Sequence, residues 1–390
     1  MIHRFSVRGP LAWVVAATFL HFTSFYYLFS TLPVYVLDLG GSTFQVGLVI
    51  GGLNVVSLAV RPLFGIWMDR AGRRSFLVFG AAIYVVAGLG YLAIRSIPAL
   101  LALRLFHAIG LATFSTAAAS LAGDLAPLRR RRTTMGVYGL AQAGALTVGP
   151  GLGEAARNAL GNSGLFLVTA LTALGALACA LAVPTTVRTE RGSRIRQGSP
   201  PQGSMLRRGG TPVWAQFAAS IPYGTFLSFV AVVGKSRGLE SVGAFFALMA
   251  LSSLGVRLIA GRVYDALGLR VVLVPALLCV AFGMILLAIT PRTALFMLAA
   301  VLTGAGTGAV HTVLLAHVVE TSPTETRGTS VAVFTSCWEL GAGGGAILMG
   351  RLAQEAGFAA MFAVASSFAV IGMGGLMFLR HNKDAVERRI

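Results

Sequence analysis

A charged loop that recurs at a fixed distance along the chain most constrains what this sequence can fold into. The loop runs from Gly65 to Arg74 between two long apolar stretches, and a partly altered copy follows 196 residues later. The matching pairs are Arg61/Arg257, Gly65/Gly261, Asp69/Asp265, Gly72/Gly268, Arg74/Arg270, Gly110/Gly306, Asp124/Glu320, Pro127/Pro323, Arg131/Arg327 and Gly149/Gly345. A constant offset over a stretch of this length predicts two similar halves in tandem.

Composition decides which solvent these halves face. Hydrophobic residues make up 56% of the chain and charged residues 11%, whereas a soluble domain has about 25% charged residues. The apolar surface is too large for water to be the only solvent, so the chain is expected to lie in a lipid bilayer. Lipid permits only helices or a closed barrel. The apolar runs are continuous rather than alternating, which favours helices.

Twelve apolar runs are long enough to cross a bilayer, which needs roughly 20 residues per helix. They cover residues 11–36, 45–68, 76–94, 99–123, 134–157, 163–183, 213–234, 241–263, 271–290, 293–318, 329–350 and 358–379. We therefore expect an all-α membrane protein with twelve transmembrane helices. Its parts are a six-helix bundle over 1–183, a basic linker over 184–212, a second six-helix bundle over 213–380 and a tail over 381–390.

The linker holds six arginines among several prolines and glycines, so it is too polar and too broken to be one stable helix. The sequence leaves open whether part of it forms a short basic helix on the membrane surface.

Positive charge is distributed unevenly between the predicted loops. If the N-terminus is inside, 21 of the 31 Lys and Arg residues lie in inside segments and six in outside segments. This bias predicts that both termini are cytoplasmic. It also accounts for the net charge of +18, because inside loops face anionic lipid. Nucleic acid is not an expected partner, since the basic loops carry almost no aromatic residues for base stacking.

The first copy of the loop combines small and charged residues. Gly65 is expected to let a neighbouring helix approach closely, and Asp69 suits a facing helix N-terminus. Arg73 is placed to pair with Asp124 at the inner end of the fourth run. The second copy has Ala266 and Leu269 at the positions of Arg70 and Arg73, so its contacts should be weaker. The alternative is a solvent-exposed loop whose positive charge only orients the protein in the membrane.

Ionisable residues lie inside two of the apolar runs. Arg104 is several residues inside its run, where a buried guanidinium costs several kcal/mol unless it is paired or hydrated. It could also extend to the outer interface instead. His107 lies one turn further on the same face, with a packing role and a proton-handling role equally open. Glu339 lies about ten residues into its run, near mid-membrane at 1.5 Å per residue, and either titrates or stays permanently protonated.

A glycine-rich stretch with one proline lies late in the fifth run, at Gly149, Pro150 and Gly153. Proline removes a backbone hydrogen bond and bends a helix, and glycines allow close packing. The alternative is that glycine and proline are simply frequent in membrane helices.

These stretches together resemble the major facilitator superfamily, in particular its arabinose-efflux-like and drug:proton antiporter permeases. The first loop matches the family's G-x-x-x-D-R-x-G-R-R signature without a gap. The stretch from Arg104 to Gly110 is similar to R-x-x-q-G-x-G, with Ala108 at the first glycine. Residues 149–154 are similar to G-P-x-x-G-G, except that Glu154 replaces the last glycine. Residues 338–341 resemble an acidic-Leu-Gly signature, and the resemblance covers nearly the whole chain.

The resemblance implies two bundles related by a pseudo-two-fold axis along the membrane normal. It also implies roles for the motif residues. The proton-coupling residues that it implies are Glu339, Arg104 and His107. A pivot that favours export is formed by Gly149, Pro150 and Gly153. A cytoplasmic gating loop is formed by Gly65, Asp69, Arg70, Gly72, Arg73 and Arg74 with Asp124.

Polar residues elsewhere in the runs are candidates for the substrate cavity, each with a structural role as its alternative. They are His21, Tyr27, Asn54, Gln142, Tyr223, His311 and Trp338. We further hypothesise that Arg104 and Glu339 face one cavity from opposite halves, because Ala300 and Ala143 occupy their counterpart positions.

Several chemistries have no support in the sequence. Lysine occurs only at 235 and 383, and no phosphate-binding loop is complete, so we expect no ATP or other cofactor and transport driven by a proton gradient. The three Cys and six His form no ligand set, so no metal is expected. No activated-nucleophile motif is present, so the chain is not expected to be an enzyme.

The sequence therefore predicts a proton-coupled secondary transporter that exports a small organic molecule, acting as a monomer in the cytoplasmic (inner) membrane. The alternatives are a proton symporter that imports a sugar or other metabolite, and a transport-inactive sensor on the same fold.

Overall fold

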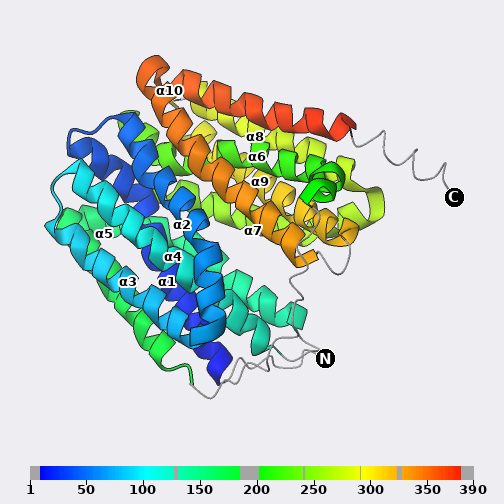
Figure 1. Cartoon of the computed structure of the whole chain (residues 1–390). Helices are drawn as coiled ribbons and strands as arrows, with labels where there is room; N and C mark the ends of the chain where they lie inside the picture. The colour runs from blue at the N-terminus through cyan, green and yellow to red at the C-terminus, as the bar shows by residue number, and fades with distance from the viewer. Residues whose placement is uncertain are drawn as a thin grey trace, which may run out of the picture. The chain divides into compact units, whose positions relative to one another are not determined.

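The structure is a computed structural model that describes residues 9–126, 131–184, 202–239, 242–289, 291–322 and 327–378 (Figure 1). These residues form helices and turns, and no strand occurs among them. The helical elements are α1 (Pro10–Asp38), α2 (Thr43–Ala71), α3 (Arg73–Ala93), α4 (Ile97–Asp124), α5 (Arg131–Leu181), α6 (Gln202–Ser236), α7 (Val242–Leu267), α8 (Leu269–Ile289), α9 (Thr293–Thr321) and α10 (Arg327–Phe378). All ten are long and apolar enough to cross a membrane. The expected all-α membrane fold is thus confirmed.

Two of these elements each contain two helices joined at a glycine. The helical backbone is broken in α5 at Gly161, with φ 69°, and in α10 at Gly357, with φ 83°. Glycine adopts positive φ without the steric cost that other residues have. Figure 1 shows the two parts of α10, in orange and red, running in opposite directions. The breaks fall between the predicted runs 134–157 and 163–183 and between 329–350 and 358–379. The number of membrane crossings itself stays a prediction.

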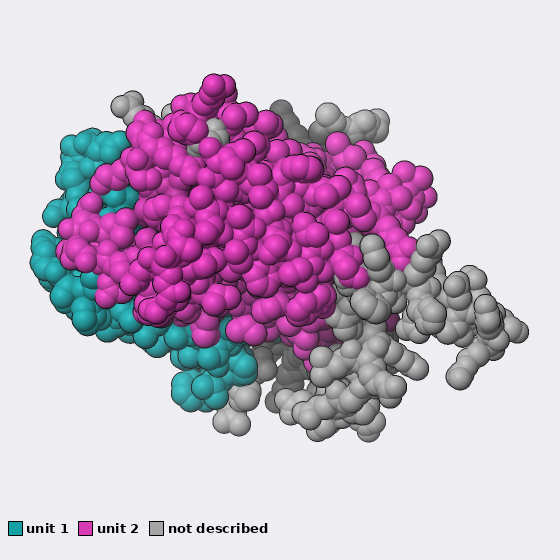
Figure 2. Space-filling view, turned by 90° about the horizontal axis from the view of Figure 1, so that it is seen from above, with its two compact units in different colours: residues 1–35, 56–197 teal, residues 36–55, 198–390 magenta. Residues whose placement is uncertain are grey.

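The chain forms two compact units, coloured separately in Figure 2. Unit 1 comprises residues 1–35 and 56–197, and unit 2 comprises 36–55 and 198–390. The early part of α2 belongs to unit 2 because it packs closely on α10. A Cβ added at Gly47 would lie 2.5 Å from the Ala346 carbonyl oxygen, and one at Gly51 would overlap that of Gly343. Small residues permit this approach of two helix backbones.

Part of the predicted basic linker over 184–212 is helical in the structure. The helix α6 begins at Gln202, so residues 202–212 continue a helix rather than an irregular linker. Adding residues to an existing helix costs much less than nucleating one, so the apolar run can extend into polar sequence. Residues 185–201 and the tail over 381–390 lie outside the described residues.

The internal repeat is visible in the packing of each unit. One core cluster of unit 1 and one of unit 2 have nine members each at positions 196 residues apart. These pairs are Met68/Tyr264, Phe76/Val272, Leu77/Leu273, Ala81/Leu277, Phe114/Val310, Ala117/Val313, Ala118/Leu314, Ala122/Val318 and Tyr138/Phe334. Gly161 and Gly357 keep the same offset. The tandem similarity predicted from the sequence is therefore a similarity of tertiary structure.

Candidate functional site

A buried polar cluster lies inside unit 1, where α1, α3 and α4 meet. Close packing of α3 on α4 sets its geometry. A Cβ added at Gly80 would lie 2.6 Å from the backbone nitrogen of Phe114, and one at Gly110 would lie 2.7 Å from Ile83 Cγ2. The missing side chains let the two backbones approach, which places the tyrosines of α3 beside the polar residues of α4.

Arg104 is at the centre of this cluster and is fully buried. Its Nη1 donates to Tyr91 Oη at 3.5 Å and lies 3.4 Å from His107 Nδ1. Tyr91 Oη and His107 Nδ1 are themselves 3.1 Å apart. The guanidinium carbon lies 5.6 Å from the centre of the Phe25 ring, which presents its negative face to the cation. Arg104 therefore does not extend to the surface, which was one of the two positions that the sequence allowed.

His21 of α1 stacks between two aromatic rings in the same cluster. Its ring centre lies 3.6 Å from that of Phe114 and 3.7 Å from that of Tyr84. The Tyr84 ring in turn contacts the His107 ring edge-on at 3.9 Å. The cluster is thus a set of planar groups around one arginine.

Six buried polar atoms of the cluster have no hydrogen-bond partner among the described residues. They are Arg104 Nε and Nη2, His107 Nε2, both ring nitrogens of His21 and Tyr84 Oη. Buried polar groups are normally hydrogen-bonded, and an unpaired buried charge is especially costly. Six such atoms in one place make this cluster a candidate functional site.

A second polar cluster lies in unit 2 between α6, α9 and α10. Gln216 Nε2 lies 2.8 Å from His311 Nδ1, and the Trp338 ring lies 5.1 Å from His311 and 4.7 Å from Tyr223. Glu339 follows Trp338 on α10 and is half-buried. Three of the predicted cavity residues are therefore brought together. Because Arg104 belongs to unit 1 and Glu339 to unit 2, their shared cavity stays a prediction.

The ion pair expected from the sequence joins the first residue of α3 to the last residue of α4. Arg73 Nη1 donates to Asp124 Oδ2, which confirms that contact. Arg74 donates to the carbonyl oxygens of Val183 and Leu181, at 2.5 and 2.8 Å. It thereby caps the end of α5, where carbonyls lack helical partners and a cation is favourable. Gly72 has φ 87° and allows the sharp turn between the helices.

Other expectations for this loop stay predictions or fall outside the described residues. A Cβ added at Gly65 would meet no described atom within 4 Å, and the close helix approach expected there stays a prediction. The sequence pattern identified a glycine, but only tertiary packing decides which face of a helix has a neighbour. The side chains of Asp69 and Arg70 lie outside the described residues.

The glycine–proline stretch of α5 packs directly on α1. A Cβ at Gly149 would lie 2.7 Å from Tyr26 Cβ, and one at Gly153 would lie 2.5 Å from the Tyr27 carbonyl oxygen. Ser30 Oγ donates to the Pro150 carbonyl at 2.8 Å. These contacts place the stretch at a tight helix crossing, and its role as a pivot stays a prediction.

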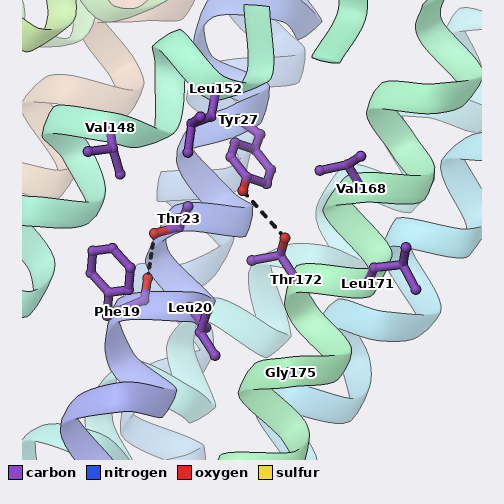
Figure 3. A pocket seen from close by; sticks show the side chains of 10 residues that line it. All are labelled: Phe19, Leu20, Thr23, Tyr27, Val148, Leu152, Val168, Leu171, Thr172 and Gly175. Atoms are coloured by element: carbon purple, nitrogen blue, oxygen red, sulfur yellow. Dashed lines mark hydrogen bonds between the residues drawn. The ribbon is translucent and has the colours of Figure 1, made fainter. Parts of the chain in front are cut away.

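An apolar groove of about 360 Å³ lies beside this crossing, between α1 and both halves of α5 (Figure 3). Tyr27 and Thr172 meet in it, with their hydroxyls 3.4 Å apart. Leu152 and Leu171 line it and are about half exposed. Tyr27, predicted for the substrate cavity, thus lies at a groove of apolar character.

The remaining cavity candidates lie close to residues of their own units. Gln142 donates to Tyr138 Oη at 3.0 Å within α5, and a Cβ added at Gly343 would lie 2.9 Å from Asn54 Cβ. The sequence reasoning missed Tyr84 and Tyr91, which hold central places in the unit 1 cluster. Their signal was their spacing of seven residues, two helical turns, which places both on one face of α3.

Fold and site together define a helical membrane protein of two similar units, each with its own buried polar cluster. The sequence profile of the Major Facilitator Superfamily matches residues 14–293 and 213–389. The chain belongs to this superfamily.

Similar proteins are spread widely. An uncharacterized MFS-type transporter of Methanocaldococcus jannaschii is 23% identical over 90% of this chain and 92% of that protein. The human organic anion transporter MFSD10 has a TM-score of 0.70 and 19% identity, over 94% of this chain and 98% of that one. The nucleoside transporter NupG has a TM-score of 0.79 and 12% identity, over 95% and 99%. At such identities the solved structures show the fold alone.

Proposed function

We propose that this protein is a proton-coupled secondary transporter that exports a small organic molecule by alternating access. The observation that carries the proposal is an asymmetry of charge within the helices. Unit 1 buries a cation, Arg104, whereas unit 2 holds a half-buried carboxylate, Glu339, on α10. Ionisable groups inside membrane helices are costly and mark ion or substrate pathways.

Glu339 is the proposed proton-carrying group, with Arg104 and His107 as the polar groups whose interactions change when it is protonated. Protonation removes one negative charge and so biases the equilibrium between inward-facing and outward-facing states. The Arg73–Asp124 pair acts as a cytoplasmic latch. The crossing at Gly149 and Gly153 acts as the pivot, and its resemblance to an antiporter motif supports export.

The protein is proposed to act as a monomer in the cytoplasmic membrane, with both termini inside and no cofactor. A cysteine introduced at the exposed Ser75, in the first turn of α3, tests the orientation in a variant whose three native cysteines are replaced by serine. In intact cells an impermeant maleimide should leave it unlabelled, and should label it in inside-out vesicles. Labelling in intact cells would show that the orientation is opposite to the one proposed.

Proton movement in proteoliposomes tests the coupling. A thermal-shift screen of small organic molecules on the purified chain supplies a ligand, because a binder of the native state raises its stability. That ligand is then added outside vesicles containing pyranine at equal pH on both sides. An antiporter exchanges entering ligand for leaving protons, so the interior should become alkaline.

Two variants on α10 sharpen this experiment. Glu339→Gln should abolish the pH change while the ligand still raises the melting temperature. Glu355→Gln, which removes an exposed carboxylate paired with Arg351, should behave as the wild type. Interior acidification would indicate symport and contradict export. A normal pH response in Glu339→Gln would exclude that residue as the coupling group.

A further inference from the structure

The hydrogen-bonding capacity of Arg104 is only partly used. Nη1 is the nitrogen with partners, Tyr91 Oη and His107 Nδ1. Nε and Nη2 have none among the described residues, although both are buried. No carboxylate in the described part of unit 1 pairs with this arginine. A buried guanidinium in this condition requires an anionic or hydrated partner.

The two unused nitrogens are adjacent on one edge of the guanidinium plane. Their N–H groups are parallel, and a carboxylate, sulfonate or phosphate can accept from both at once. The occupied nitrogen, Nη1, is turned toward His107 and Tyr91, which fixes the direction of the free edge. The arrangement is therefore selective for a planar or tetrahedral oxyanion over a single-point acceptor.

Further unused groups lie around the same position. Tyr84 Oη and His107 Nε2 lack partners among the described residues, as do both nitrogens of His21. The Phe25 ring lies against the cation, and the rings of His21, Tyr84 and Phe114 pack on one another beside it. An oxyanion attached to an aromatic or other apolar body would satisfy the donors and place that body among aromatic rings.

We propose that the Arg104 cluster of unit 1 is the substrate-binding site for organic anions, with Arg104 Nε and Nη2 binding the oxyanion group. The inference rests on the proposed transport function and adds the substrate class. All of these groups are buried in the present conformation, so the site is closed here.

The charge of the substrate has a consequence for energy coupling. Export of one monovalent anion in exchange for one entering proton moves two positive charges inward in net terms. The inside-negative membrane potential then drives both halves of the exchange. Transport should therefore respond to membrane potential as well as to pH, whereas exchange of a neutral molecule for one proton would move a single charge.

A matched ligand set tests the inference on the full-length purified protein. The probes are 2-naphthoate, 2-naphthalenesulfonate, 2-naphthamide and 2-naphthylmethylamine, which share one aromatic body and differ in charge. Dissociation constants are measured by isothermal titration calorimetry in detergent. The two anions should bind at least tenfold more tightly than the amide, and the amine should not bind. Equal binding of naphthoate and naphthamide, or no binding by any member of the set, would overturn the proposal.

Variants of Arg104 give a second readout. Arg104→Gln should remove the preference for anions, and Arg104→Lys should retain part of it, because the charge remains but the two-pronged geometry is lost. Arg95→Gln serves as the control, since Arg95 is exposed and contacts only the carbonyls of Leu92 and Ile94. An undiminished anion preference in Arg104→Gln would place the site elsewhere. The wild-type ligand comparison stands even where a variant does not fold.

The outcome separates this inference from the proposed function. Glu339→Gln should keep the anion preference and lose proton movement. Anion binding without any proton movement in the wild type would contradict the coupling and leave the site intact. Proton movement driven by a neutral ligand, with no anion preference, would support the coupling and contradict the site.

Discussion

The two units share a fold but differ in what they bury at equivalent positions. In unit 1, α3 and α4 enclose Arg104, His107, Tyr84 and Tyr91. The residues 196 positions later in unit 2 are Ala300, Thr303, Val280 and Leu287, which are also buried. His21 corresponds to Phe217. The same helix pair thus surrounds a polar cluster in one unit and a nearly apolar core in the other.

This comparison indicates which residues the fold requires and which the function requires. Gly110 packs on Tyr84 and on the carbonyl oxygen of Gly80, and Gly306 packs on Val280 and on that of Ala276. The glycine contact is common to both units, so it belongs to the fold. The buried arginine is not needed for the helices to pack, because unit 2 packs without it. Its cost in unit 1 therefore supports the proposal that Arg104 serves transport.

The largest effect is expected from giving unit 2 the arginine of unit 1. Ala300→Arg places an unpaired cation in a nearly apolar core and should destabilise the protein by about 4 kcal/mol or more. Fluorescence-detected size exclusion and the melting temperature measure the loss. Ala300→Met is the control, because it adds a similarly long side chain without charge. Equal stability of the two variants would mean that unit 2 can accommodate the cation as unit 1 does.

Removing the arginine from unit 1 should change the free energy of unfolding by a smaller amount and in the opposite direction. Arg104→Met removes a buried charge with unused donors and should stabilise the unliganded protein by about 1–4 kcal/mol. Transport should be lost at the same time. A lower melting temperature than wild type would show instead that the charge of Arg104 is already compensated. Arg95→Met, at an exposed position, should change neither property.

Features governed by local sequence were predictable. The breaks at Gly161 and Gly357 follow from the gaps between apolar runs, and the Arg73–Asp124 contact follows from charges at the ends of two successive helices. The repeat alone assigns Asp124 and Glu320 to equivalent positions. Each of these depends on few residues close to a helix end, where the choices are limited.

Features governed by helix facing were not predictable. Gly65 and Gly110 both recur in the repeat, yet among the described residues a close neighbour is found at Gly110 and none at Gly65. Tyr84 and Tyr91 were missed because a helix that is apolar all round gives no sign of which face meets Arg104. The close packing of Gly51 on Gly343 also depends on contacts between distant segments.

The carboxylate of unit 2 that corresponds to Asp124 is Glu320, which contacts Tyr264 near the ends of α7 and α9. Tyr264 donates to Glu320 Oε2 at 2.5 Å and lies 3.2 Å from His317 Nδ1. Where unit 1 has the Arg73–Asp124 ion pair, unit 2 thus has a neutral donor to the corresponding carboxylate. Tyr264→Phe removes that donor and should destabilise the protein by about 1.5–3 kcal/mol, the range for hydrogen bonds to charged groups. A melting temperature unchanged from wild type would show that Glu320 is satisfied without Tyr264.

The smallest effect is expected at the ion pair of unit 1. Arg73→Leu gives unit 1 the residue that unit 2 has at Leu269, and the pair is partly exposed, with about a quarter of each side chain accessible. Its loss should cost about 1 kcal/mol or less. Because salt screens partly exposed charges, the difference from wild type should shrink between 0.1 and 1 M NaCl, at Debye lengths of about 10 and 3 Å. The loss of stability in Tyr264→Phe should stay constant over the same range of salt, since the donor that it removes is uncharged. If both deficits respond to salt alike, the two contacts are electrostatically equivalent, and the difference between the units is confined to the buried cluster around Arg104.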